Sequence, residues 1–169
     1  AGEEIGFYTG KNAFECHQAA VATPAVITPF QSAEGLEVNP VGVADALEIT
    51  NGTTDLSKAA YTVGSFDDNS KTIFFEANIN IDDISSVTEL AVGFRKTEAY
   101  QAAVNSYNTY ATFNIGGVAA GRIDIETELN GAGLATTDTT EADVADGEAL
   151  RLRIEVTNGG VCKFFLSQT

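Results

Sequence analysis

The sequence predicts an all-β fold, an antiparallel two-sheet jelly-roll sandwich with one short helix and an extended N-terminal arm. Three features predict it. Apolar and polar residues alternate with period two along six segments, as they do in half-buried strands. Turn residues such as Asn and Gly separate several of these segments. The segments are short and numerous, and two packed antiparallel sheets are the usual way for such strands to bury their apolar sides.

Length and composition are those of a single globular domain. The chain has 169 residues, of which 44% are hydrophobic, and a chain of this size can bury about 70% of its unfolded surface. It carries 24 acidic and nine basic side chains, a formal net charge of −15. Such a charge repels phosphate groups, so nucleic acid and anionic membranes are poor partners. We therefore predict one acidic domain, residues 1–169, that binds neither.

The first 70 residues are less regular than the rest. Short strands are expected at residues 14–19, 46–50 and 60–64. The segment 21–40 contains all three prolines and little periodicity, which predicts an extended arm or a long loop that reaches a neighbouring subunit. Residues 97–105 form the one helix-like stretch, with Thr97 as a cap before an Ala-rich run.

The alternating strands lie in the second part of the chain. They are expected at residues 73–81, 88–95, 109–115, 122–129, 150–156 and 161–166. Asn158-Gly159, between the last two, is a strong hairpin signal because both residues tolerate positive φ. In the strand at 122–129, apolar residues alternate with Arg122 and three acids, which predicts an acidic face turned to water.

From residue 72 onward, the order of these strands resembles the concanavalin A-like jelly roll of the lectin/glucanase and laminin G type. The segments that carry the resemblance are 73–77 (IFFEA), 92–95 (VGFR), 123–128 (IDIETE), 150–156 (LRLRIEV) and 161–165 (VCKFF). It is similar in particular to the versions found in structural proteins of tailed bacteriophage virions. The resemblance covers about the last hundred residues and implies the fold. It does not decide among lectins, glycosidases and structural modules, all of which use this fold.

The laminarinase-like glycosidases of this fold carry the signature Glu-x-Asp-x-Glu on one strand. We compare the strand at 122–129 with this signature to ask whether the chain is a glycosidase. Retaining hydrolysis needs a carboxylate nucleophile and a second carboxyl group. Asp124 and Glu126 match the second and third acids, but Arg122 occupies the nucleophile's position. A shifted register of Asp124, Glu126 and Glu128 places the shorter Asp where Glu is needed. We therefore predict no catalytic residues and no enzymatic activity.

Aromatic residues are the other candidate functional groups. Sugar-binding sites use an aromatic plate against a pyranose ring, and the chain has no Trp. Tyr100, Tyr107 and Tyr110 flank the expected helix. These three tyrosines are candidates either for sugar binding or for a protein interface, since Tyr provides a large contact area at low entropy cost.

No metal or cofactor is predicted. His17 is the only histidine. The acidic stretches at 67–69, 82–83 and 138–146 lack the alternating ligand loop of a calcium site. Cys16 and Cys162 either form a bridge or remain thiols, and the low cysteine count favours thiols.

Together these observations predict a non-enzymatic structural protein at the surface of a tailed-phage virion, such as a capsid decoration or cement protein. Its expected partners are copies of itself, in a trimer by family analogy, and other virion proteins such as a major capsid protein. The alternative is a secreted carbohydrate-binding module or a weak laminarinase-like glycosidase, with a glycan as its ligand.

Overall fold

A computed structural model describes residues 15–19, 30–32, 35–37, 46–50, 72–96, 98, 101, 103–157 and 159–169. The chain divides into two compact units. Unit 1 comprises Ala1–Tyr61 with Thr97–Ala102, and unit 2 comprises Thr62–Lys96 with Ala103–Thr169. Each unit is described by itself. The expectation of a single domain over residues 1–169 stays a prediction.

The described part of unit 1 consists of two short antiparallel strand pairs. Strand β1 (Glu15–Ala19) pairs with β4 (Ala46–Thr50), which confirms the strands expected at 14–19 and 46–50. Strand β2 (Phe30–Ser32) pairs with β3 (Gly35–Glu37) across a two-residue connection. A hairpin therefore lies inside the segment 21–40 that was expected to be an extended arm or a long loop. The expected strand at 60–64 lies outside the described residues.

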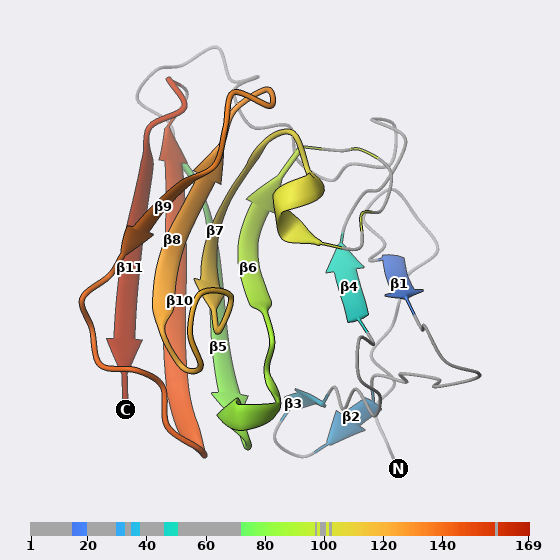
Figure 1. The fold of residues 1–169 in the computed structure, drawn as a ribbon, viewed down its shortest axis with the longest axis vertical. Coiled ribbons are helices and arrows are strands. Elements are labelled where there is room, and N and C mark those ends of the chain that lie inside the picture. The colour runs from blue at the N-terminus through green and yellow to red at the C-terminus, as the bar shows by residue number, and fades with distance from the viewer. Residues whose placement is uncertain are drawn as a thin grey trace. The chain divides into compact units, whose positions relative to one another are not determined.

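Unit 2 contains two antiparallel sheets, drawn one behind the other in Figure 1. The three-stranded sheet has the order β11-β10-β5, and the four-stranded sheet has the order β6-β7-β8-β9. The strands are β5 (Thr72–Ile81), β6 (Leu90–Arg95), β7 (Tyr110–Ile115), β8 (Ile123–Glu128), β9 (Ala135–Asp138), β10 (Glu148–Thr157) and β11 (Cys162–Gln168). Single turns of 3-10 helix, η2 (Ile84–Ser86) and η3 (Val104–Ser106), lie in two of the connections. The predicted all-β, two-sheet sandwich is thus confirmed at this level.

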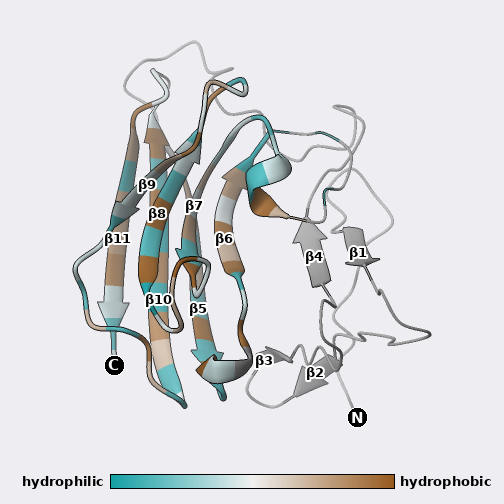
Figure 2. Ribbon diagram, in the orientation of Figure 1, coloured by the Kyte–Doolittle hydropathy of each residue, from teal (hydrophilic) through white to brown (hydrophobic). Residues whose placement is uncertain are grey.

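The apolar core lies between these two sheets. Phe113 and Ile115 of β7 pack with Leu152 and Ile154 of β10, and each of the four is at most 1% exposed. Inward-facing apolar residues alternate with polar ones most regularly along β8 and β10, as the period of two requires. Figure 2 shows this alternation as brown and teal bands along the strands. Burial of these side chains is the main favourable contribution to the stability of unit 2.

The hairpin between β10 and β11 forms where the Asn-Gly signal predicted it. Val156 lies opposite Cys162, and the Gly160 N–H donates to the carbonyl of Thr157 at 2.9 Å. Of the two loop residues that the structure describes, Gly160 has a positive φ, at +78°. A left-handed glycine after a turn is typical of three-residue hairpin loops. Gly160, the residue after the Asn-Gly pair, supplies this conformation.

Two expectations differ from the structure. A helix was expected at 97–105. Among the residues described there, the 3-10 turn that begins at Val104 is helical, whereas Gln101 and Ala103 are not. Ala103 is extended, at φ −137° and ψ 145°, so local Ala propensity is overridden there. Strand β9 was not predicted, because its sequence ATTD has no apolar alternation and all four residues are exposed. Within the described residues, no helix has the length and hydropathy of a membrane span.

Candidate functional site

The outer face of the four-stranded sheet carries a set of polar side chains, here called the polar face. In the pairing of β7 with β8, Asn114 lies opposite Asp124, Thr112 opposite Glu126 and Tyr110 opposite Glu128. The residues between them point into the core, so these six point to the opposite side. The polar face is defined as Tyr110, Thr112, Asn114, Asp124, Glu126 and Glu128.

Most of the polar face is buried. Asn114 is 2% exposed, Asp124 1% and Glu126 5%. The expectation that this acidic strand faces water is therefore wrong for Asp124 and Glu126. One reason is β9, which pairs with β8 and makes it an interior strand. Another is Gly117, which lies so close to Asn114 that a Cβ atom there would be 2.7 Å from the amide Oδ1.

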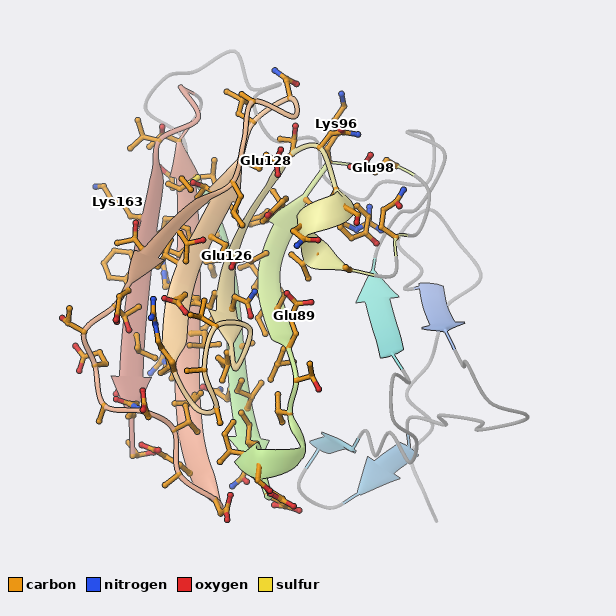
Figure 3. The ribbon with its side chains drawn as sticks, in the orientation of Figure 1. Glu89, Lys96, Glu98, Glu126, Glu128 and Lys163 are labelled. Carbon is orange, nitrogen blue, oxygen red and sulfur yellow. The ribbon has the colours of Figure 1, made fainter. Side chains whose placement is uncertain are left out.

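The Asn114 amide links two carboxylates. Its Nδ2 donates to Glu89 Oε1 and to Glu126 Oε2, each at 2.9 Å. Two acceptors of one amide nitrogen lie about 5 Å apart, since its two N–H bonds diverge by about 120°. Figure 3 shows Glu89 and Glu126 on this face, with Glu128 further along β8. Glu89, Asn114 and Glu126 form the acid–amide cluster.

Arg122 neutralises Asp124. Its Nε and Nη2 both donate to Asp124 Oδ1, at 3.0 and 2.6 Å, and Nε lies 3.4 Å from Asp138 Oδ2. The hydrogen bond to Asp124 is the main cause that raises the pKa of the Arg122 guanidinium above its usual value. A buried carboxylate needs such a partner to remain charged. Arg122 therefore neutralises one of the three acids of this strand.

Four buried polar atoms of the polar face have no hydrogen-bond partner among the residues that the structure describes. They are Tyr110 OH, Thr112 Oγ1, Asn114 Oδ1 and Asp124 Oδ2. Buried polar groups are nearly always satisfied by protein, water or ligand. These four atoms are therefore the unused hydrogen-bonding capacity of the polar face.

The Tyr110 phenol is held neutral by its surroundings. Burial raises its pKa most, and the nearby negative charges of Glu126, Glu128 and Glu89 raise it further, to about 12. The phenol is consequently available as a hydrogen-bond donor throughout the physiological pH range.

The three tyrosine candidates have different surroundings. Tyr107 is 6% exposed and Tyr110 is 3% exposed, so neither offers a free aromatic plate to a sugar ring. The Tyr107 ring packs under the guanidinium of Arg95, 4.6 Å from its centroid. Tyr100 lies outside the described residues.

The predicted absence of a metal site is not contradicted. In the part of the chain that the structure describes, no group of three or more His, Cys, Asp or Glu side chains is arranged to hold a metal ion. Cys162 is a free thiol whose pKa is raised by burial. The side chains of Cys16 and His17 lie outside the described residues.

Sequence reasoning missed Asn114 and Glu89. The signal available for Asn114 was its place in a strand, since Asn is depleted in strands and its amide needs partners when it is buried. Glu89 lies just before β6, where no spacing rule relates it to the acids of β8. Its hydrogen bond with Asn114 follows only from the pairing of β6 with β7.

No family model, no curated protein and no solved structure matches the chain.

Proposed function

We propose that this chain is a non-enzymatic structural subunit at the surface of a tailed-phage virion, a capsid decoration or cement protein with a concanavalin A-like jelly-roll fold. The resemblance of the strand order from residue 72 onward supports the proposal, together with the two-sheet antiparallel sandwich of unit 2. In this role the chain binds copies of itself, in a trimer by family analogy, and other virion proteins such as a major capsid protein.

The observation that carries the non-enzymatic assignment is the state of the β8 acids. Arg122 occupies the position of the glycosidase nucleophile, and a guanidinium cannot attack an anomeric carbon. Its two nitrogens hold Asp124 Oδ1, and Asn114 holds Glu126 against the sheet. A retaining mechanism needs one carboxylate free to form a glycosyl bond. Here Asp124 and Glu126, the two β8 acids that match the glycosidase signature, are both engaged in hydrogen bonds within the sheet.

A comparison of particles with and without the protein tests the proposal. Virions that lack it are expected to lose infectivity faster on heating and on dilution into low salt than complete virions. Addition of the purified protein is expected to restore their resistance, whereas addition of an unrelated acidic protein is not. Equal resistance of the two kinds of particle would contradict the cementing role.

A second candidate function, saccharide binding with weak glycosidase activity, is favoured by the acid–amide cluster. The Glu89 and Glu126 oxygens about 5 Å apart approach the spacing of roughly 5–5.5 Å that retaining glycosidases use between their carboxyl groups. The unpartnered Thr112 Oγ1 and Tyr110 OH lie on the same face.

A β-glucan assay and a glycan array distinguish the two functions. The proposed structural role predicts no release of reducing ends and no saturable sugar binding. Activity or binding that is lost in Glu126→Gln and Glu89→Gln, and kept in Glu155→Gln on the other sheet, would favour the saccharide function. The Glu155 variant is the matched control, because its carboxylate also accepts side-chain hydrogen bonds, from Arg153, but lies outside the cluster.

A further inference from the structure

The outer face of the three-stranded sheet exposes two phenylalanines. Phe74 of β5 is 59% exposed and Phe165 of β11 is 48% exposed. On the solvent face of an antiparallel sheet, large apolar side chains that lie near one another are typical of an interaction surface rather than of a solvated one. The aromatic–basic face is defined here by Phe74, Arg151, Arg153, Lys163 and Phe165.

Arg153 connects the two rings. It lies directly opposite Phe165 in the pairing of β10 with β11. Its guanidinium lies over the ring of Phe74, 4.2 Å from the centroid. Glu155 holds this guanidinium through Nη2 at 2.7 Å and Nε at 2.9 Å. The surface is therefore already ordered before a partner arrives, which lowers the entropic cost of association.

Arg151, Arg153 and Lys163 share this side of the sheet with the carboxylates of Glu76 and Glu155, so three positive and two negative groups leave the face a formal charge of +1, opposite in sign to that of the chain. Three of the nine basic side chains lie on it, on a protein of net charge −15. The Arg residues share the carboxylates of Glu76 and Glu155. Lys163 is exposed and has no ion pair within the described residues, and Figure 3 places it at the β11 edge, away from the glutamates of the polar face. An acidic partner is complementary to this face.

An acidic surface lies at the far end of the same sheet. Two connections meet there, because the Ile84 N–H donates to Asp146 Oδ1 at 2.8 Å and the Gly147 N–H donates to the Ile81 carbonyl at 2.8 Å. The meeting exposes Asp82, Asp83 and Asp146, which define the acidic tip. Asp82 follows Phe74 by eight positions along extended chain, a distance of roughly 26 Å. The tip therefore cannot contact the phenylalanine end of its own face.

We propose that the aromatic–basic face binds the acidic tip of a second copy of this chain. Because face and tip are different surfaces, the contact is heterologous, and repetition of it closes a ring or extends an array. The inference deepens the proposed function, on which its biological setting rests, by naming the partner of this face. The contact supplies apolar burial through Phe74 and Phe165 and charge complementarity through Lys163 and Arg151.

Light scattering coupled to size-exclusion chromatography, over a range of concentrations, tests the contact. The wild-type chain is expected to self-associate. Phe74→Ser with Phe165→Ser removes the face, and Asp82→Lys reverses one charge of the tip; each variant is expected to raise the dissociation constant at least about tenfold. Leu129→Ser with Leu134→Ser is the matched control, because these residues are also exposed, at 66% and 43%. It is expected to associate like the wild type.

Mixing the two defective variants separates a heterologous contact from a symmetric one. The face variant keeps its tip and the tip variant keeps its face, so an equimolar mixture is expected to form a 1:1 dimer and nothing larger. No dimer in the mixture would overturn the heterologous contact. A wild-type chain that stays monomeric at all concentrations would overturn the proposal. If the face variant then also failed to bind particles, the face would bind another virion protein instead of a second copy of this chain.

The result is independent of the proposed function. Self-association through the face in a protein absent from virions would refute the function and keep the contact. A monomeric protein that protects particles would refute the contact and keep the function.

Discussion

Replacement of Asn114 by Leu, which has nearly the same shape, removes both hydrogen bonds of the acid–amide cluster. Each bond to a carboxylate contributes about 1.5–3 kcal/mol, whereas loss of the unpartnered Oδ1 recovers about 1–3 kcal/mol. Glu126, only 5% exposed, is left without its amide donor, which adds to the cost. We therefore expect the free energy of unfolding to fall by about 2–4 kcal/mol.

Urea denaturation followed by far-ultraviolet circular dichroism measures this loss, and the melting temperature is expected to fall by at least about 5 °C. The matched control is Asn78→Leu on the exposed face of β5, which is expected to change stability by less than about 0.5 kcal/mol. If Asn114→Leu were as stable as the wild type, the amide would not be holding the two glutamates, and the structural reading of the polar face would be refuted.

Three further changes test other parts of the same unit. Thr112→Val removes an unpartnered buried hydroxyl and is expected to leave stability unchanged or raise it by about 1–2 kcal/mol; a loss in the same denaturation assay would reveal a partner. Tyr110→Phe removes a phenol whose folded pKa of about 12 exceeds the usual value of 10.0. The unfolded chain releases this proton first, so the wild type is expected to lose stability as pH rises from about 10 to 12, and the variant to lose less. At Gly93, a Cβ atom would lie 2.3 Å from the Ala111 carbonyl and 2.8 Å from Ile154 Cδ1. Gly93→Ala is therefore expected to lower the free energy of unfolding by about 1–3 kcal/mol or more, and with it the melting temperature. An unchanged melting curve would be inconsistent with this packing.

Period-two alternation predicted the strands of unit 2 well, because a half-buried strand must place apolar side chains on one face. Leu150, Leu152, Ile154 and Val156 are all buried in β10, as their spacing indicated. Strand β9 escaped prediction because an exposed edge strand has no apolar face to reveal it. The prediction of a helix is wrong at Ala103, where the backbone is extended. An Ala-rich run gives only a weak local preference for helix, and the surrounding structure overrides it.

The polar face was predicted only in part. Alternation correctly placed Asp124 and Glu126 on the side of β8 away from the core. It says nothing about what covers that side, so their burial was not predicted. Glu89 and Glu126 are 37 positions apart in the sequence, and only sheet pairing brings both to the amide of Asn114. Contacts of this kind depend on tertiary structure, which local patterns do not encode.

Quantitative mass spectrometry of gradient-purified virions is the most direct test of the structural role that we propose. The protein is expected to co-sediment with infectious particles in many copies per particle, in a constant ratio to the major capsid protein across the peak. Recovery only from the soluble fraction of the lysate, with none in the particle peak, would contradict it.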